Sequence, residues 1–556
     1  MYDLTIIGGG IAGLYTIYKY LKHTENKTKE TKNKETKTKR ILLLESTSRL
    51  GGRVKTVHNK GQTYESGAGR FSNYHHLLLE LIKEFNLDSQ IFPIKAKKIF
   101  IDEESKSHTK IPITNQTDKA LQELSSLIKQ KNITDEYLLS KTLFEIAKEL
   151  SPKIADILDK FYPYYSELNV MNARDGLILM QRDFSNNVNY FVLGGGLEQI
   201  IDKLVDYIKK HKNVQIKLET PLIDISRITK NLKSKTNKNY YELKTFDSKI
   251  YQTKNLFLAI PSKAILSIPF FNNPNNPNNN TTLIKKLLKL VSPQPLYRIY
   301  AKYKEPFLDK QIITNSELSF IIPYNQEGLI MITYTDGVDT KYWLKQYLKS
   351  KENLIDKIHQ KLKEIIPDIK IPELEWIDGS TSYYESGAHY WKPRKLKEYM
   401  DPEELEDKIR HSEDLPNLWI IGEAFSNYQA WIEGSLLTSS KAINELLEQE
   451  KEEEKEENTN KEELKHLEQE YNLFGGKNNN KFTLEEVSKH NKKDDAWLII
   501  NNKVYDITKW IPIHPGGMII MKGVGKDATE LFNNIGHDNY AKNKLKTFQI
   551  GLLSVS

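Results

Sequence analysis

The sequence predicts an α/β, Rossmann-like dinucleotide-binding fold followed by a small, separate domain near the C-terminal end. Three observations predict it. A strand-like run from Leu4 to Ile7 leads through a glycine-rich turn into a helical stretch. The chain has 556 residues, more than one hydrophobic core usually organises, which indicates two to four domains. After an acidic tract at residues 448–470, the pattern changes abruptly at Lys481, where short strand-like and helical segments begin.

The glycine-rich turn has the spacing of a dinucleotide-binding site. Gly8, Gly10 and Gly13 form GxGxxG between the strand and the helix. The first glycine permits a tight turn, the second lets backbone amides approach a pyrophosphate, and the third lets the helix pack on the strand. A second apolar strand ends in Glu45, whose carboxylate suits a ribose diol. Glu45 follows Gly13 by 32 residues, and we attribute the excess over the usual spacing to a polar insertion at residues 24–40.

Composition and charge exclude several classes of protein. The chain has no cysteine, which excludes disulfides and cysteine-linked cofactors and leaves histidine or carboxylate for any metal. The net charge is +7, but charged tracts at residues 24–40 and 448–470 lack interleaved aromatic residues, so nucleic acid is not an expected partner. No run approaches the roughly 20 apolar residues of a membrane span, and no leader precedes the first strand. We expect a cytoplasmic protein without a membrane anchor.

Further motifs point to one kind of dinucleotide site. They are RLGGR at residues 49–53, ESGAGRF at 65–71, LWIIGEA at 418–424 and AWIEGS at 430–435. Together with the GxGxxG turn they resemble the flavin-containing amine oxidase family, which includes monoamine, polyamine and L-amino-acid oxidases. The resemblance implies FAD as cofactor and a two-domain amine oxidase fold. It assigns residues 1–90, 190–275 and 410–447 to the FAD-binding domain and residues 91–189 and 276–409 to an α+β substrate-binding domain.

The resemblance also implies which residues hold FAD. Arg53 would neutralise the pyrophosphate, and the strand that ends in Gly422 and Glu423 would place backbone and carboxylate near the ribityl chain. The helix that begins near Trp431 would point its N-terminal amides at the flavin ring. Leu222 occupies the place where the family binds adenine through main-chain atoms. The implied FAD-binding residues are Gly8, Gly10, Gly13, Glu45, Arg53, Gly69, Arg70, Leu222, Gly422, Glu423 and Ile432.

The reaction implied by the resemblance is oxidation of a C–N bond, in which hydride passes to the flavin and water hydrolyses the imine. His389 and Trp431 match the two aromatic positions that flank the substrate. Arg70 matches the arginine that clamps the substrate carboxylate in L-amino-acid oxidases and tryptophan monooxygenases, and its planar fork suits a carboxylate. A contact with FAD phosphate or with a nearby carboxylate is the alternative role for Arg70. The substrate would be a primary amine, a polyamine or an L-amino acid, and the candidate catalytic residues are Arg70, Arg298, His389 and Trp431.

Two residues depart from the family pattern. Arg298 stands where the family commonly keeps a lysine that holds a water near the flavin, and its broader guanidinium puts the reactivity with oxygen in doubt. Thr47 stands where an arginine near the FAD phosphates is usual, which predicts weaker FAD binding.

A second pattern occupies the C-terminal region. Thr483 to Glu486 reads as a capping box that opens a short helix. His514, in HPGG, and His537, in GH, are 23 residues apart. With the VYDIT and GKDAT segments they resemble cytochrome b5, which makes both histidines axial ligands of the iron of haem b and the module a carrier of single electrons. We assign residues 448–480 to an acidic flexible linker and residues 481–556 to a small α+β cytochrome b5-like domain.

Three interpretations of the function remain open. The first is a flavohaemoprotein in which electrons pass from FAD to the haem, to O2 or to a redox protein. The second keeps the fold but oxidises another substrate, as desaturases and protoporphyrinogen oxidases do; a long apolar tunnel would favour it, whereas a compact aromatic cage with Arg70 would favour an amine or amino acid. The third is a haem electron-transfer protein with a decayed flavin site, which Thr47 and Arg298 would allow.

Overall fold

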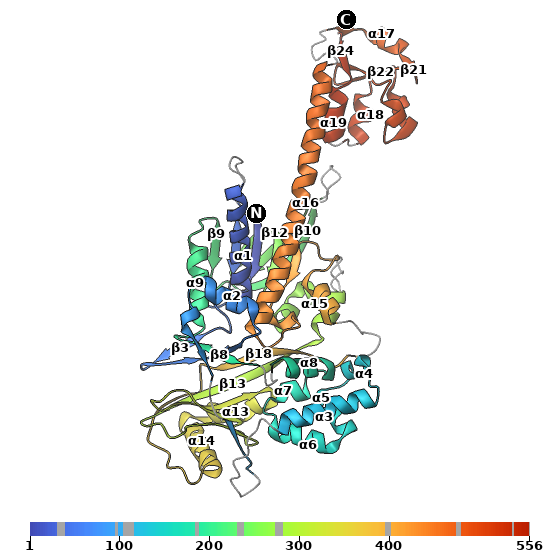
Figure 1. The fold of residues 1–556 in the computed structure, drawn as a ribbon. Coiled ribbons are helices and arrows are strands. Elements are labelled where there is room, and N and C mark those ends of the chain that lie inside the picture. Colours follow the sequence, from blue (N-terminus) through green and yellow to red (C-terminus); the bar gives the residue numbers. More distant parts are fainter. Residues whose placement is uncertain are drawn as a thin grey trace. The chain divides into compact units, whose positions relative to one another are not determined.

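The structure of the chain is a computed structural model, drawn in Figure 1. It describes residues 1–30, 39–94, 98–103, 116–183, 188–230, 238–272, 282–394, 402–473, 480–535, 537 and 539–554. The chain divides into two compact units, of which the first comprises residues 1–228 and 240–444 and the second residues 229–239 and 445–556. The boundary at residue 444 falls inside the long helix α16 (Ile432–Leu473).

A seven-stranded sheet contains the N-terminal strand of the first unit. Its elements and the helices beside it are β1 Tyr2–Ile7, β2 Ile41–Leu44, β9 Val214–Lys217, β10 Leu222–Lys230, β11 Lys238–Thr245, β12 Ile250–Leu258, β19 Leu418–Ile420, α1 Ile11–Glu30 and α9 Glu198–Lys209 (Figure 1). The strand order is β10-β11-β12-β1-β2-β9, with β19 paired to β12. Strands β9, β2, β1, β12 and β19 run parallel, and β11 is antiparallel to β12. This sheet confirms the predicted α/β fold.

Buried apolar residues explain why β1 and β2 lie inside this sheet. All four residues of β2 and the last four of β1 are buried, as parallel strands covered on both faces require. Parallel strands end at one edge of a sheet, which is where α/β proteins bind ligands. Gly8 follows β1, Glu45 follows β2, and the segment from Ile421 to Glu423 follows β19 at that edge. The topology therefore brings together motifs that are far apart in the sequence.

A second seven-stranded sheet and two groups of helices form most of the remaining first unit. The strands are β7 Lys98–Ile101, β13 Val291–Tyr303, β14 Gln311–Thr314, β15 Phe320–Pro323, β16 Leu329–Asp336, β17 Leu374–Asp378 and β18 Tyr383–Trp391. Their order is β17-β13-β16-β15-β14-β7, with β18 paired to β13. The helices are α3 Gln116–Gln130, α4 Asp135–Leu139, α5 Leu143–Leu150, α6 Pro152–Phe161, α7 Tyr165–Asn169, α8 Ala173–Asp183, α13 Thr340–Lys349 and α14 Lys351–Ile365. All of these elements lie in the ranges expected for the substrate-binding domain.

Shorter elements complete the first unit. They are β3 Thr56–Asn59, β4 Gln62–Glu65, β5 Phe71–Ser72, β6 Ile91–Pro93, β8 Tyr190–Leu193, α2 His76–Glu84, α10 Ser262–Ser267, α11 Pro269–Asn272, α12 Thr282–Leu288 and α15 Pro402–Arg410. Strands β3 and β4 form a hairpin, and β5, β8 and β6 form a three-stranded sheet. The segment from Ser66 to Arg70 joins β4 to β5 and belongs to the site described below.

The second unit contains a five-stranded sheet with short helices. Its elements are β20 Lys481–Phe482, β21 Asn491–Lys492, β22 Asp495–Ile500, β23 Lys503–Asp506, β24 Gln549–Leu553, α17 Leu484–Lys489, α18 Thr529–Ile535 and α19 Asn539–Lys546. The strand order is β20-β24-β23-β22-β21. The predicted capping box is confirmed: the Thr483 side chain accepts from the backbone of Glu486, and the Glu486 side chain accepts from the backbone of Thr483.

The acidic tract is helical as far as Leu473, whereas the sequence analysis expects a flexible linker over residues 448–480. Helix α16 runs into this tract without interruption. Glutamate and lysine have high helix propensity, and pairs four residues apart add small stabilising terms, so a helix can form without an apolar face. Residues 474–479 of the tract lie outside the described residues, as do residues 31–38 of the basic tract and 273–280 of the asparagine-rich tract.

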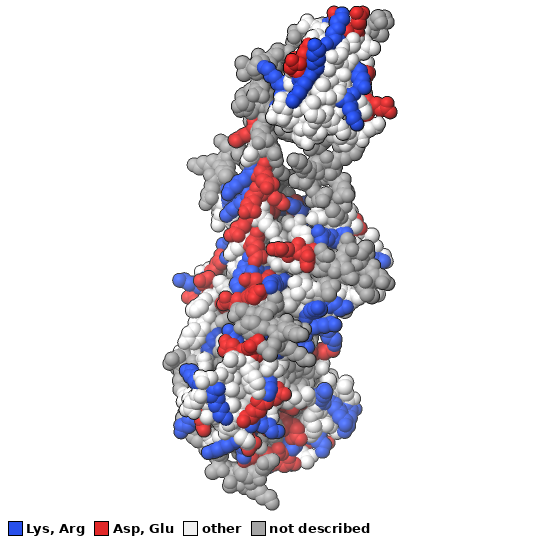
Figure 2. Space-filling model, turned by 90° about the vertical axis from the view of Figure 1, so that its right-hand side faces the viewer, with Lys and Arg blue, Asp and Glu red and all other residues white. Residues whose placement is uncertain are grey.

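Two features bear on binding to membranes and to nucleic acid: the hydropathy of the described helices and the charge on the face drawn in Figure 2. Within the parts of the chain that the structure describes, no helix combines the length and the hydropathy that crossing a bilayer needs. On the face drawn in Figure 2, basic and acidic side chains are interspersed. This face therefore gives no support to binding of nucleic acid, which requires clustered positive charge.

Candidate functional site

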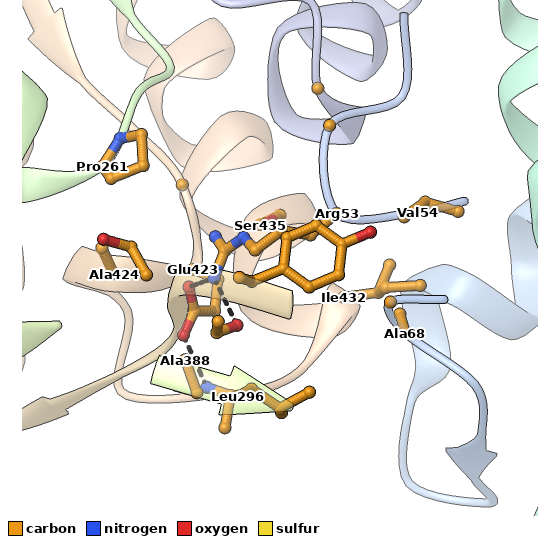
Figure 3. A pocket seen from close by; sticks show the side chains of 18 of the residues that line it. Arg53, Val54, Ala68, Pro261, Leu296, Ala388, Glu423, Ala424, Ile432 and Ser435 are labelled. Carbon is orange, nitrogen blue, oxygen red and sulfur yellow. Dashed lines mark hydrogen bonds and ion pairs between the residues drawn. The ribbon is translucent and has the colours of Figure 1, made fainter. Parts of the chain in front are cut away.

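A cavity in the first unit brings together most of the predicted site residues. It has a volume of about 460 Å³ and lies where strands of the first sheet end, against the second sheet. Arg53 and Glu423 point toward each other in its wall (Figure 3). The predicted residues that line it are Gly8, Gly10, Glu45, Arg53, Gly69, Arg70, Arg298, Gly422, Glu423, Trp431 and Ile432. Gly13, Leu222 and His389 are not among the lining residues.

The glycine turn after β1 leaves room for a phosphate group. A Cβ atom on Gly13 would lie 2.1 Å from the carbonyl oxygen of Gly8, so the close contact of helix and turn requires glycine there. A Cβ atom on Gly10 would meet no atom within 4 Å, so packing within the protein does not require glycine at that position. The open space lies at the N-terminus of α1, where unpaired backbone N–H groups attract anions. The turn therefore fits the pyrophosphate of FAD.

Glu45 is held at the edge of the cavity by neighbouring donors. Its Oε2 accepts the backbone N–H of Gly9 at 2.7 Å. Its Oε1 accepts the backbone N–H of Thr47 and lies 2.8 Å from the Thr47 hydroxyl. Thr47 thus orients this carboxylate, where an arginine would instead meet phosphate. The Ser46 hydroxyl also donates to Oε1, at 3.3 Å, so the acceptor position left for a ribose hydroxyl is on Oε2.

The carboxylate of Glu423 is the centre of a buried cluster. Its Oε2 lies 2.7 Å from Nη1 of Arg53 and 2.9 Å from Nδ1 of His389. Its Oε1 accepts the backbone N–H groups of His389 and Ala430, at 3.0 and 2.9 Å. Burial alone would raise the pKa of Glu423, but Arg53 and His389 hold it well below the usual range. Glu423 therefore balances the charge of Arg53, which the sequence analysis assigned to the pyrophosphate.

His389 lies behind the cavity wall, and Tyr390 lines the cavity instead. The two residues are neighbours in β18, and successive side chains of a strand point to opposite faces. His389 is fully buried and contacts Glu423 through Nδ1. Trp431 and Tyr390 both line the cavity, with Tyr164, Tyr334 and Tyr384, whereas the expected partner of Trp431, His389, does not. An aromatic residue directly after His389 was the signal for this arrangement.

Arg70 lies among aromatic side chains. Its guanidinium carbon is 4.9 Å from the ring centroid of Tyr190 and 5.7 Å from that of Trp431, and its Nη2 donates to the Tyr164 hydroxyl at 2.7 Å. Burial alone would lower the pKa of Arg70, but nearby tyrosine hydroxyls, Tyr164 above all, raise it, so the group stays charged. Among the described residues no carboxylate forms an ion pair with Arg70. A charged fork without a counter-ion suits an anionic ligand.

Arg298 is tied to the segment that carries Arg70. Its Nη1 donates to the carbonyl oxygens of Glu65, at 3.3 Å, and Gly67. Its guanidinium carbon lies 4.6 Å from the ring centroid of Tyr334. A guanidinium held on two carbonyls is less suited to bind a single water than the compact ammonium of a lysine. Arg298 therefore positions the segment between Glu65 and Arg70.

Helix α16 begins at the cavity, as the sequence analysis expects. Ile432 is its first residue, and Trp431 directly precedes it. The Trp431 ring stacks on Tyr190 with a centroid distance of 5.8 Å, and its Nε1 donates to Asp183 at 2.8 Å. By contrast, Leu222 begins β10 and packs against the core of the first sheet, so the structure does not bring it to the cavity.

The cavity also contains residues that the sequence analysis did not identify. Glu167 lies in α7, and Tyr164 directly precedes that helix. Asp336 is the last residue of β16. Tyr334 and Gln294 complete this side. All five lie in the region where no motif stands out. In the sequence, the only sign of these residues is a carboxylate beside apolar and aromatic residues, and this pattern is too common to predict a site.

The second unit orients the two predicted haem ligands through backbone carbonyls. Nδ1 of His514 is 3.1 Å from the carbonyl oxygen of Gly517, and Nδ1 of His537 is 3.0 Å from that of Phe532. Because a carbonyl only accepts, each Nδ1 carries the proton and each Nε2 is left to bind a metal. Apolar residues nearby are only partly buried, as a pocket for haem requires: Trp510, Ile520, Met521, Phe532, Leu545 and Phe548.

The substitutions Gly10→Ala and Gly13→Ala should separate FAD binding from folding. Gly10→Ala is expected to leave the thermal stability of the FAD-free protein unchanged, while its methyl group lowers FAD affinity by roughly tenfold or more. Gly13→Ala is expected to lower that stability as well, because its Cβ meets Gly8 at 2.1 Å. Thermal unfolding and FAD titration measure the two effects. An unchanged FAD affinity in Gly10→Ala would contradict the placement of the phosphate.

Removing either haem ligand should abolish six-coordinate haem. His514→Ala and His537→Ala are each expected to lose the visible bands of bis-histidine haem, because one axial position loses its nitrogen. His490→Ala is the matched control, since His490 stacks on Trp497 and pairs with Asp495 in the same unit. Absorbance spectra after haem reconstitution give the answer, and wild-type bands in either ligand variant would refute the assignment.

One solved structure and two curated proteins are similar to parts of this chain. A solved structure, a putative protoporphyrinogen oxidase from Exiguobacterium sp. 255-15, matches with a TM-score of 0.56 at 17% identity and covers 80% of this chain and 98% of that one, which shows the fold. Cytochrome b5 of Rhizopus stolonifer is 51% identical over 73 residues, and that of Borago officinalis 51% over 71. These matches cover 13% of this chain and 56% and 54% of those proteins, so the chain spans about half the length of these relatives.

Family models assign both parts of the chain. The model of the cytochrome b5-like heme/steroid binding domain matches residues 483–554, and that of the flavin containing amine oxidoreductases matches residues 35–447. The first implies haem and the second FAD, which agrees with the geometry of the two sites. The chain therefore belongs to the flavin containing amine oxidoreductase family and carries a cytochrome b5-like domain at its C-terminal end.

Proposed function

We propose that the first unit oxidises the C–N bond of an α-amino acid and that the electrons leave through the haem of the second unit. The family makes the chain an FAD-dependent oxidoreductase. The substrate proposal rests on Arg70, a charged guanidinium in an aromatic cavity that pairs with no carboxylate among the described residues. Bound FAD would supply a hydride acceptor, and bound haem would supply transfer of single electrons.

In this proposal the residues of the cavity bind and orient the substrate. Arg70 holds the α-carboxylate, and Tyr390 and Trp431 flank the reacting carbon and exclude water. The neutral amine loses the hydride of its C–H bond and then a proton from nitrogen, which leaves an imine. Water hydrolyses the imine to a 2-oxo acid and ammonium. This chemistry needs no acid or base from the protein at the carbon itself.

Arg298 supports the haem, rather than O2, as electron acceptor. The family commonly places a lysine and its water at this position, and water positioning there is linked to the reaction with oxygen. In this chain the guanidinium donates to the carbonyls of Glu65 and Gly67 and lies over the ring of Tyr334. A group engaged in this way holds a water less well, which favours transfer to the haem.

The substitution Arg70→Lys tests the carboxylate clamp. Lysine keeps the charge but loses the bidentate fork, so the rate constant of flavin reduction divided by Kd should fall roughly 10- to 100-fold for amino acids. For the corresponding decarboxylated amines, which lack the carboxylate that Arg70 would bind, the change should be much smaller. Arg174→Lys, outside the cavity, is the control variant. Equal losses for amino acids and amines would contradict the proposal.

Anaerobic mixing tests the route of the electrons. When reconstituted protein meets a panel of amino acids, polyamines and amines without oxygen, flavin absorbance should bleach first and the bands of reduced haem should follow. In His514→Ala the flavin should still bleach. A flavin that is reduced while the wild-type haem stays oxidised for minutes would show that the haem is not the acceptor.

A second candidate is oxidation of a larger substrate, such as the one in the name of the solved structure with a similar fold. That protein is a putative protoporphyrinogen oxidase, but at 17% identity the likeness concerns the fold alone. Protoporphyrinogen IX belongs in the anaerobic panel for this reason. Flavin reduction by this compound, with none by any amine or amino acid, would select the second candidate. Purified protein that carries haem but binds no FAD would instead indicate a decayed flavin site.

A further inference from the structure

Glu167 lines the cavity with one carboxylate oxygen unpartnered. The residue belongs to α7 and is 6% exposed. Its Oε2 accepts from the hydroxyl of Tyr162. Among the described residues, no hydrogen bond or ion pair involves its Oε1. A carboxylate oxygen in the wall of a cavity is a strong acceptor, and a donor on a bound ligand can reach it.

The surroundings of Glu167 favour a cation. Asp336 lines the same cavity, and its two oxygens accept the backbone N–H groups of Tyr165 and Ser166 at 3.0 and 2.8 Å. Burial, with a contribution from Asp336, raises the pKa of Glu167 to about 8, and burial raises the pKa of Asp336 to about 6. Two carboxyl groups in one wall repel each other when ionised, and a bound cation would relieve that repulsion.

Arg70 does not fill this role. Its charge lowers the pKa of Glu167, so the two groups are electrostatically close. No ion pair joins them within the described part of the chain, and the guanidinium donates to the Tyr164 hydroxyl instead. The cavity thus presents a positive group that has no carboxylate partner and a carboxyl group that has no cationic partner. A ligand that carries both signs of charge would complement both groups.

We propose that Glu167 is the subsite for a cationic side chain, so that the preferred substrate is an α-amino acid whose side chain ends in an ammonium or guanidinium group. The inference rests on the proposed function, in which Arg70 holds the α-carboxylate. The terminal cation donates to Oε1 of Glu167, with the charge of Asp336 nearby. The aliphatic stem packs against tyrosine rings of the cavity, as long cationic side chains do along apolar surfaces. Neutral side chains of equal length leave Glu167 without a partner.

The first test compares charged and neutral substrates of matched shape. Anaerobic flavin reduction is measured with L-lysine against L-norleucine and with L-arginine against L-citrulline, as the ratio of the rate constant divided by Kd. The wild-type protein should prefer the cationic member of each pair by roughly tenfold or more, the range of a charge-assisted hydrogen bond. In Glu167→Gln the ratio should fall toward one. Glu136→Gln, an exposed glutamate of α4, should keep the wild-type ratio.

The pH dependence of the same ratio is a second readout that needs no variant. Glu167 is protonated below about pH 8 in the empty cavity, so the preference for lysine over norleucine should grow as pH rises through that value. Because the α-amines of the two substrates ionise at different pH, each rate constant is first divided by the fraction of neutral amine, which titration of the free substrate gives. The groups that face Glu167 are Arg70, Asp183, Asp336, Tyr162, Tyr164, Tyr190 and Tyr390.

The outcomes distinguish this inference from the proposed function. Flavin reduction by norleucine as efficient as by lysine, or a preference that survives in Glu167→Gln, overturns the subsite and leaves the role of Arg70 intact. If Glu167→Gln fails to fold, the wild-type ratio and its pH dependence decide. Absence of flavin reduction by every amino acid overturns the proposed function and this inference together.

Discussion

The buried carboxylate of Glu423 is the contact on which the flavin cavity depends. It joins the segment after β19 to Arg53, to His389 of β18 and to the amide of Ala430, just before α16. These segments are distant in the sequence, and each contributes lining residues. The group works as a clamp because it is ionised, and its pKa is held low by Arg53 and by its contact with His389. Removing one partner would leave a buried charge uncompensated, which costs more than the contact itself.

Local sequence was sufficient to predict the parts of the fold with strong backbone constraints. Gly8 has a positive φ of 105°, which favours glycine. A Cβ atom on Gly13 would lie 2.1 Å from the carbonyl oxygen of Gly8, so only glycine fits there. Such constraints are visible in the sequence as a motif. Apolar strands β1 and β2 were predictable for a similar reason, since burial on both faces excludes polar residues. Local sequence also predicted the capping box at Thr483. Both histidines were assigned as haem ligands through the resemblance to cytochrome b5.

The rest of the site depends on register and on tertiary contacts, which leave weaker patterns. Successive side chains of a strand point to opposite faces, so the expectation that His389 lines the cavity was wrong while its neighbour Tyr390 does line it. The contact of Arg53 with Glu423 was not predicted, because the two residues are some 370 residues apart in the chain. The role of Arg53 at the pyrophosphate stays a prediction. Glu167 lies on a short helix without a motif. The helical acidic tract was missed because low complexity and the absence of an apolar face suggested a linker.

The stoichiometry of the two cofactors has a consequence for turnover. Oxidation of one C–N bond releases two electrons, while one haem with a single iron accepts only one. His514 and His537 would both hold a bound haem through Nε2, since each Nδ1 contacts a backbone carbonyl, and a haem held by two histidines would supply electron transfer without binding O2. If electrons leave through the haem, as proposed, the iron must be reoxidised between the two transfers. Under this proposal the fused domain would pass electrons on without storing them, and sustained turnover would require an external acceptor of single electrons.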